Sequence, residues 1–345
     1  MSERNKPAAT MADIAAAAGV SVSTVSRALS GSPLVASAKV EEILRIARES
    51  GYVVNATARN LRLKRTQTIG VVIPLAHEAG QPLTDPFLSQ MIIHLADEIT
   101  LRGYGMFLQK VLAPGHDWLQ HLIASGRADG FIIIGQSTER DTLQVVADNY
   151  LPLVVWGGRL AGDRYCTVGT DNRAAMALVT RHVLETGRKR LVFLGNPKMP
   201  ELGLRYAGYA EAVTEAATKD PTVGPPRSVP VHLTANGAYD AVRELIASGV
   251  DFDALVCASD VIAVSALRAL TSAGLTVPGD VAVTGYDDIP LAAHANPSLT
   301  TVHQDLPLAA GTLVERLFRR MDGHNLPSVT LPTEIVVRES TAVAG

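Results

Sequence analysis

The chain has 345 residues, of which 47% are hydrophobic and 19% charged, with a formal net charge of −3. This length suits two or three domains with a large buried core, and the composition is that of an ordinary globular protein kept in a reducing compartment. Its two cysteines, Cys166 and Cys257, have no Cys or His at metal-binding spacing, which argues against a metal site. No stretch has the length of a signal peptide or a membrane span, so we expect a cytoplasmic protein that needs no cofactor.

The segment 10–29 predicts two short helices joined by a tight turn. Thr10 can cap a first helix over Met11–Ala18, Gly19 ends it, and Ser21 starts the next helix. The apolar residues of the second helix recur at helical spacing, at Val22, Val25 and Leu29. This is the outline of a helix-turn-helix, whose second helix enters the major groove of DNA. The outward side chains of that helix are predicted to be Ser23, Thr24, Ser26 and Arg27.

The charge of the chain is divided unevenly. Residues 1–65 carry a net charge of +5, and the remaining residues carry −8. A basic N-terminal module on an acidic body is what attraction to DNA phosphates requires. The charge distribution therefore favours DNA binding over the alternative, a small structural pair of helices on an enzyme.

A third helix and a linker are expected after this motif. Ser37 can cap a helix over Ala38–Ser50, which Gly51 would end. Its apolar face, which would pack across the first two helices, consists of Val40, Ile43, Leu44 and Ala47. Residues 1–9 are expected to be a disordered lead-in, 10–54 a helix-turn-helix domain, and 55–65 a linker whose short polar helix needs a partner surface in order to fold.

From residue 66 onward, short apolar runs bounded by Gly or Pro alternate with helical stretches. The expected strands of a first series are 69–74, 105–109, 131–134, 153–156 and 167–169, and those of a second series include 190–194, 254–257 and 281–284. Expected helices between them include 87–101, 118–125 and 141–149. Such alternation predicts an α/β body with parallel sheets and two lobes around a cleft, and ligands bind at the carboxyl ends of parallel strands.

Several segments, in this order, carry a resemblance to a known family. They are MADIAAAAGVSVSTVSRAL, VASAKVEEILRIARESGY, NATARNLR, TQTIGVVIP, GRADGFIII, GYDDIP, PSLTTVHQ and VVRESTA. On these motifs, which cover nearly the whole chain, the protein resembles the lac repressor/galactose repressor (LacI/GalR) family of bacterial transcriptional regulators.

The resemblance implies a fold. An all-α helix-turn-helix head would be joined by a hinge helix to a two-lobed body like that of periplasmic sugar-binding proteins, with parallel sheets and three chain crossings. The effector-binding and dimerisation domain would span 66–345. Its first lobe would comprise about 66–170 and 301–331, and its second lobe about 171–300 and 332–345.

The resemblance also implies DNA contacts. Positions that read bases match Val22, Ser23 and Arg27, and positions that hold phosphates match Thr10, Ser21, Thr24, Ser26, Tyr52 and Asn55. Leu61, with Arg62 beside it, matches a leucine that wedges between central base pairs from the minor groove. Such a wedge unstacks a base step at a cost of a few kcal/mol and gains wrapped contact surface. The sequence departs from the family at Val54, where Pro is common.

For the cleft, the resemblance implies a small polar effector. Arg205 matches an arginine that hydrogen-bonds the effector, and Asp287 matches an acid that accepts protons from its hydroxyl or amide groups. Further contacts are expected from Asp85, Phe87, Trp156, Arg159 and Asp260. Trp156 could stack on a sugar ring, although a packed interface tryptophan is the alternative.

At the positions that contact the purine in purine-binding members of the family, this sequence has residues of another kind. An arginine, a threonine and a stacking aromatic residue are replaced by Met199, Glu201 and Leu233. These changes favour a sugar or sugar derivative, and Glu201 could accept protons from its hydroxyl groups.

The sequence therefore predicts an allosteric transcriptional regulator. The expected protein is a nucleoid-associated homodimer that binds pseudo-palindromic double-stranded operator DNA and represses sugar-utilisation genes until a sugar binds. A regulator with a purine, nucleoside or other corepressor is the alternative, and a sugar-binding protein without gene regulation would not carry the basic head. No enzyme is expected, because Gly-x-Ser-x-Gly, His-Glu-x-x-His, phosphate-loop and Cys-x-x-Cys motifs are missing from the sequence.

Overall fold

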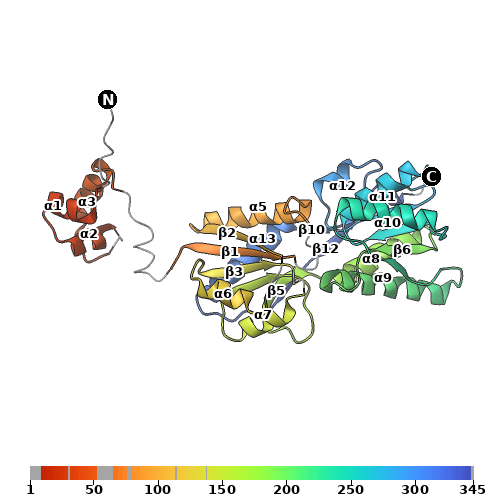
Figure 1. Cartoon of the computed structure of the whole chain (residues 1–345), viewed down its shortest axis with the longest axis horizontal. Helices are drawn as coiled ribbons and strands as arrows, with labels where there is room; N and C mark the ends of the chain where they lie inside the picture. The colour runs from red at the N-terminus through yellow and green to blue at the C-terminus, as the bar shows by residue number, and fades with distance from the viewer. Residues whose placement is uncertain are drawn as a thin grey trace, which may run out of the picture. The chain divides into compact units, whose positions relative to one another are not determined.

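The computed structural model describes residues 9–29, 32–52, 65–75, 80–112, 115–136 and 138–342. The chain divides into two compact units, Met1–Thr66 and Gln67–Gly345. Figure 1 labels the helices and strands of both units.

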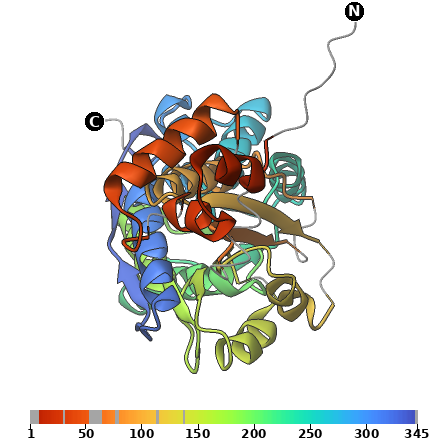
Figure 2. The same ribbon diagram turned by 90° about the vertical axis from the view of Figure 1, so that its left-hand side faces the viewer.

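The first unit is helical. Helices α1 (Met11–Ala18), α2 (Val22–Leu29) and α3 (Ser37–Glu49) pack against one another around an apolar core (Figure 2, red to orange). At the centre of that core lie Ile14, Val25 and Ile43, each fully buried.

The predicted start and end of α1 are confirmed. Thr10 Oγ1 accepts a hydrogen bond from the backbone N–H of Asp13 at 3.3 Å, and the N–H of Thr10 donates to the Asp13 carboxylate at 2.8 Å. Gly19 follows the helix with φ at 64°, a left-handed conformation that glycine adopts without strain.

Three predictions about these helices are wrong. The N-cap of α3 is Ala36, which has no side chain able to cap, and Ser37 is the first helical residue. Leu44, expected in the core face of α3, is 40% exposed, whereas Ile46 packs against the core. Val22, expected on the apolar face of α2, is 47% exposed. Val25 and Leu29 lie on the core side of α2 as expected, so the predicted apolar face is wrong only at Val22.

The first lobe of the second unit is built on a parallel sheet with the strand order β11-β5-β4-β3-β1-β2. Its strands are β1 (Thr68–Pro74), β2 (Gly105–Val111), β3 (Gly130–Ile134), β4 (Leu153–Trp156), β5 (Cys166–Thr170) and β11 (Val329–Leu331). Helices α5 (Pro86–Leu101) and α13 (Leu306–Met321) cover one face, and α6 (Trp118–Ala124) and α7 (Arg140–Ala147) cover the other. Because helices pack on both faces of the sheet, the sequences of these strands are continuous apolar runs.

The second lobe repeats this plan with the strand order β7-β6-β8-β9, again parallel. Its strands are β6 (Leu191–Leu194), β7 (Arg227–Val229), β8 (Ala254–Cys257) and β9 (Ala282–Thr284). Helices α8 (Asn172–Glu185) and α9 (Pro200–Lys219) pack together on one side of the sheet, and α10 (Ala235–Ala247) and α11 (Asp260–Ser272) pack together on the other (Figure 1). Helix α12 (Pro290–His294) follows β9. The predicted α/β body with parallel sheets is confirmed.

The chain crosses between the lobes more than once. After β5 it enters the second lobe through α8, and it returns through β10 (Thr301–Gln304) to α13 and β11. It then goes back through β12 (Thr333–Val336), which pairs antiparallel with β10, to the 3-10 turn η2 (Glu339–Thr341) against β9. These crossings hold the lobes side by side, so residues from both can line one pocket. Within the described residues, no helix is long and apolar enough to span a membrane.

Candidate functional site

The exposed side of α2 presents hydroxyl groups near its N-terminus. Ser21 Oγ lies 2.8 Å from Ser23 Oγ and 2.9 Å from Thr24 Oγ1, and it accepts a hydrogen bond from the N–H of Thr24 at 3.2 Å. Ser21, Ser23 and Arg27 are exposed, as is Val22. Side chains of these types can contact phosphates, a thymine methyl group and a guanine edge.

The other expected DNA contacts differ in exposure. Ser26, predicted to point outward, is only 8% exposed, because it lies with Val25 on the side of α2 that packs on the core. That prediction is wrong. Thr10 is exposed, and Tyr52 is half-buried against the helical core. Residues outside the described part of the chain include Asn55, Leu61 and Arg62.

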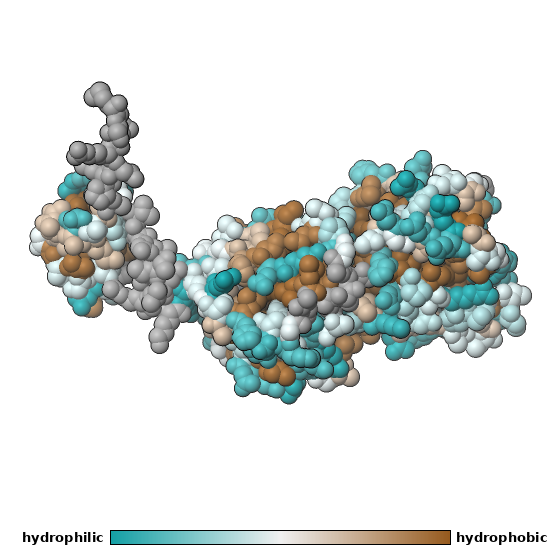
Figure 3. All heavy atoms as spheres, in the orientation of Figure 1, coloured by the Kyte–Doolittle hydropathy of each residue, from teal (hydrophilic) through white to brown (hydrophobic). Residues whose placement is uncertain are grey.

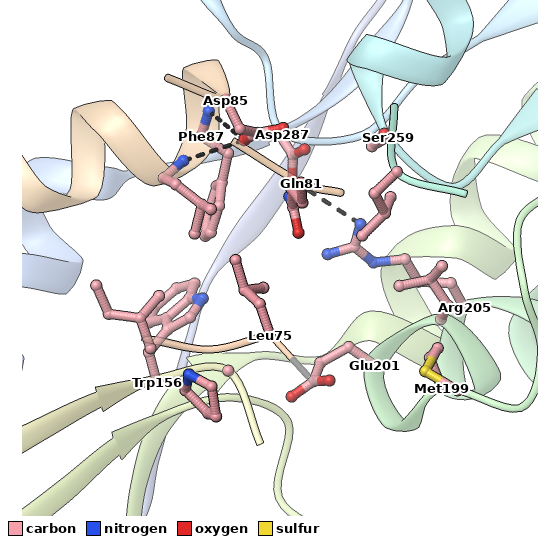
Figure 4. Close-up of a pocket in the computed structure, with 16 residues that line it drawn as sticks. Leu75, Gln81, Asp85, Phe87, Trp156, Met199, Glu201, Arg205, Ser259 and Asp287 are labelled. Atoms are coloured by element: carbon pink, nitrogen blue, oxygen red, sulfur yellow. Dashed lines mark hydrogen bonds and ion pairs between the residues drawn. The ribbon is translucent and has the colours of Figure 1, made fainter. Parts of the chain in front are cut away.

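In the second unit, a pocket lies between the lobes at the carboxyl ends of strands from both sheets (Figure 4). It has an empty volume of about 770 Å³, which includes space open to solvent. Its apolar lining comprises Pro74, Leu75, Phe87, Leu88, Ile134, Trp156, Met199, Leu202 and Leu233, and its polar lining Gln81, Asp85, Glu201, Arg205, Ser259 and Asp287. A few polar groups among apolar walls suit one small molecule.

Arg205 is held rigidly on the second-lobe side of this pocket. Its Nε donates to Asn172 Oδ1 at 2.7 Å, and its Nη1 donates to the backbone oxygen of Ala258. The guanidinium lies over the ring of Tyr286, with Cζ 3.6 Å from the ring centroid. These contacts fix the plane of the guanidinium group, which points into the pocket (Figure 4).

Asp287 lies beside Arg205. Its Oδ1 is 3.9 Å from Arg205 Nη1 and accepts a hydrogen bond from Gln304 Nε2 at 2.8 Å. Its φ is 117°, a conformation that non-glycine residues adopt only where the surroundings impose it. Burial raises the pKa of Asp287 well above its usual range, and the nearby Arg205 offsets only part of that rise. Arg205 and Asp287 together offer a ligand hydrogen-bond donors and acceptors side by side.

The first-lobe side combines a carboxyl group with an aromatic wall. Asp85 caps α5, with Oδ1 accepting from the N–H groups of Phe87 at 3.1 Å and Leu88 at 3.2 Å. Burial raises the pKa of Asp85, while these N–H groups and Gln81 act in the opposite direction. The rings of Phe87 and Trp156 lie with centroids 6.2 Å apart, tilted by 37°.

Glu201 extends from the second lobe toward the first. It lies in the first turn of α9, one turn before Arg205, and its Oε1 accepts the backbone N–H of Gln136 at 3.3 Å. Burial raises the pKa of Glu201 despite the Gln136 N–H and Arg205 nearby. Among the described lining residues, the carboxyl groups of Asp85, Glu201 and Asp287 thus accompany a single guanidinium group.

Two expected effector contacts do not line this pocket. Asp260 is fully buried, with Oδ1 accepting from the Thr301 hydroxyl at 2.6 Å and Oδ2 from the Ile289 N–H at 2.8 Å. It therefore ties the segment after β9 to β10. Arg159, just beyond β4, is exposed.

Sequence patterns did not reveal several residues of the pocket. Ser259 follows β8, but the prediction at this strand end chose its neighbour Asp260, because a strand end does not tell which adjacent side chain faces the cleft. Asn172, which orients Arg205, follows β5 and could have been found by the same signal. Gln81 precedes α5 in a stretch without periodicity, so no pattern marks it.

Known proteins share both parts of this architecture. Residues 10–55 match the family described as "Bacterial regulatory proteins, lacI family", and residues 180–341 match the "Periplasmic binding protein-like domain". The chain is 33% identical over 353 residues to the HTH-type transcriptional regulator CelR of Thermobifida fusca, covering 99% of this chain and 100% of that relative.

Two solved structures extend the likeness to three dimensions. The lac repressor dimer bound to operator and the anti-inducer ONPF matches with a TM-score of 0.83 and 25% identity, covering 98% of this chain and 100% of the other. The complex of the transcriptional regulator CelR with cellobiose matches with a TM-score of 0.69 and 30% identity, covering 96% and 99%. The chain therefore belongs to the lacI family of bacterial regulatory proteins and is a helix-turn-helix transcriptional regulator.

Proposed function

We propose that this regulator represses sugar-utilisation genes as a cytoplasmic homodimer on pseudo-palindromic operator DNA, and that a neutral sugar or sugar derivative in the pocket releases it. The juxtaposition of Arg205 and Asp287 with the aromatic wall of Phe87 and Trp156 carries this proposal. Sugar hydroxyl groups can bond to the guanidinium and carboxyl groups, while an apolar face of the sugar ring packs on the aromatic side chains.

The charges of the pocket favour a neutral sugar over a sugar phosphate. Asp85, Glu201 and Asp287 surround the single positive charge of Arg205, and that charge already interacts with Asp287. A phosphate group would bring two negative charges into a buried pocket whose one guanidinium, among the described lining residues, already interacts with Asp287. Neutral hydroxyl groups carry no such desolvation cost.

The lining also disfavours a purine corepressor. Met199 and Leu233 line the pocket, and by the family resemblance they occupy positions that hydrogen-bond to or stack on a purine in purine-binding members. A buried ring nitrogen left without a partner costs about 1–3 kcal/mol. The apolar face of a sugar ring can pack against these two side chains without leaving a buried polar atom unpaired.

The surface of α2 supports the DNA half of the proposal. We assign base contacts to Val22, Ser23 and Arg27, which are exposed together. Phosphate contacts are assigned to Thr10, Ser21, Thr24, Tyr52 and Asn55, and the minor-groove wedge to Leu61 with Arg62. Two-fold symmetry of a dimer would be mirrored in the operator.

Exposed apolar side chains on the first lobe support the dimer. Figure 3 shows hydrophobic residues gathered over α5 and β2, at the free edge of the sheet. The exposed apolar residues on α5 and just after β2 include Ile93 (58%), Leu101 (80%) and Leu112 (48%). A contiguous apolar patch on the surface of a protein commonly marks an interaction site.

Calorimetric titration of the full-length protein with a panel of probes tests the effector assignment. The panel contains cellobiose, maltose and ribose as neutral sugars, glucose 6-phosphate as an anion, and hypoxanthine as a purine. We expect a neutral sugar to bind and to lower the affinity for operator DNA in a fluorescence anisotropy titration. Binding of hypoxanthine or glucose 6-phosphate in the absence of any sugar binding would contradict the proposal.

A further inference from the structure

Two consecutive glycines of the first lobe receive the start of α9 from the second lobe. A Cβ atom built on Gly157 would lie 2.8 Å from Oε1 of Glu201, and one built on Gly158 would lie 2.8 Å from Cδ1 of Leu204. Both distances are shorter than those that real Cβ atoms show, so the ends of the Glu201 and Leu204 side chains would have to shift. We call Gly157 and Gly158 the α9 seat. Neither glycine has a positive φ, so the reason for glycine here is space and not backbone conformation.

The side chain of Gln136 forms the wall of this seat. It is 1% exposed, and its Oε1 accepts the hydroxyl of Tyr165 at 2.6 Å while its Nε2 donates to the backbone oxygen of Gly158. A Cβ atom on Gly157 would also lie 2.6 Å from that Nε2. With both ends of its amide bonded, Gln136 cannot move aside easily, and its backbone N–H is held facing the second lobe.

Glu201 connects the seat to the pocket. Its Oε1 accepts the Gln136 N–H at 3.3 Å, and its carboxyl group also lines the cavity, where Figure 4 shows it extending from α9 into the space between Arg205 and Trp156. A carboxylate has about four acceptor positions, so it can keep the bond to Gln136 and accept a ligand hydroxyl as well. Arg205 lies one turn later on the same helix, α9, so the two side chains have a fixed spacing.

We propose that Glu201 and the α9 seat form a latch that favours the closed arrangement of the lobes, and that Glu201 also selects the ligand that binds between them. This inference rests on the proposed function, because it concerns the regulation of the same pocket. A ligand is selected when it fits between the lobes and offers a hydroxyl donor to Glu201. A side chain at position 157 would displace the carboxyl group of Glu201 and so weaken the contact between the lobes.

Trp156 provides a reporter of lobe closure that needs no ligand. The chain has two tryptophans, Trp118 and Trp156, so a Trp118→Phe background leaves the pocket tryptophan alone. Trp156 is 7% exposed, and separation of the lobes would admit acrylamide to its ring. The measurement is acrylamide quenching of Trp156 fluorescence in the full-length protein without ligand.

Two variants should open the latch and two should leave it closed. Loss of one hydrogen bond lowers the ratio of closed to open molecules about fivefold, so Glu201→Ala should raise the quenching constant, and Gly157→Ala should raise it at least as much. Glu201→Gln keeps a carbonyl oxygen for the Gln136 N–H and should quench like the parent. The matched control is Gly311→Ala on α13, where an added Cβ meets nothing closer than 3.9 Å.

Comparison of the four variants shows whether the hydrogen bond of Glu201 keeps the lobes closed. Unchanged quenching in both Glu201→Ala and Gly157→Ala would overturn the proposal. Equal quenching in Glu201→Gln and Glu201→Ala would overturn it too, because the hydrogen bond would not be the cause. Should Gly157→Ala fail to fold, which circular dichroism reveals, the pair of Glu201 variants decides alone. None of these measurements contains a ligand, so their failure is distinct from failure of a sugar to bind.

Discussion

Replacing Arg205 with lysine would keep the positive charge and remove the planar guanidinium. Arg205→Lys loses the stacking on Tyr286 and can recover only one of the bonds to Asn172 and the Ala258 backbone oxygen, because lysine has one terminal nitrogen. A hydrogen bond from a charged group is worth about 1.5–3 kcal/mol, and a desolvated cation–π contact about 1–2 kcal/mol. With relaxation of the pocket, we expect the free energy of unfolding to fall by about 2–3 kcal/mol and Tm to fall by roughly 3–5 °C.

Thermal melting and operator titration together test this prediction. Arg205→Lys should bind the operator like the parent at 25 °C, where the variant stays folded, but respond to the effector sugar only at concentrations at least about tenfold higher, since one lost bond of about 1.4 kcal/mol is tenfold in affinity. The control Arg173→Lys changes an exposed arginine paired with Glu211 and should move Tm by less than about 2 °C. An Arg205→Lys variant that melts with the parent and responds to the same sugar concentration would refute the pocket assignment.

Three further predictions concern the buried Asp260, Arg27 on helix α2, and Leu61 in the linker. Burial raises the pKa of Asp260 to about 7, so between about pH 4 and pH 7 the native chain keeps a proton that the unfolded chain releases, and the free energy of unfolding falls as pH rises, by at most about 1.4 kcal/mol per pH unit. Urea titrations at several pH values should show that the free energy of unfolding of Asp260→Asn depends less on pH than that of the parent. The same pH dependence in both proteins would contradict the assignment of the proton to Asp260. Arg27→Ala should reduce discrimination at one base pair by about 1–3 kcal/mol, measured on singly substituted operators; Arg45→Ala, which removes an exposed arginine paired with Glu49, should not. Leu61→Ala should weaken operator binding far more than binding to random DNA, and an equal loss of both would exclude the wedge.

The alternation of strands and helices could be predicted because the sheets are covered on both faces. Strands such as β3 and β4 are buried throughout, so their sequences are continuous apolar runs between turns. The ends of α1 were predictable for a local reason, since Thr10 and Gly19 act on the backbone next to them. The first signal reflects burial on both faces of a sheet, and the second is purely local.

The core face of α2 could be predicted only in part because the helix spans only about two turns. Val22, Val25 and Leu29 satisfy helical spacing, yet of these only Val25 and Leu29 pack on the core, where Ala28 and Ser26 join them. Serine is small enough to be buried where its hydroxyl finds a partner, so hydropathy alone assigned Ser26 to the wrong side.

The sequence could predict which strand ends lie at the pocket, but it could not predict in which direction each side chain points. Arg205, Asp287, Phe87 and Trp156 come together as the resemblance implied. Asp260 turns instead toward the crossing segment at Thr301, because the backbone at the start of α11 sets the direction of its side chain. The contact of Glu201 with Gln136 joins residues 65 positions apart in different lobes, and no local pattern encodes it.

The central claim is that the head specifies a two-fold operator under control of the pocket. The most direct measurement is selection of bound sequences from random duplex DNA by the full-length protein, at one stated salt concentration, with and without the neutral sugars tested above. The account predicts enrichment of a pseudo-palindrome with a deformable central step in the absence of sugar, and loss of that enrichment when the effector sugar is added. Failure to enrich any motif under both conditions would contradict it.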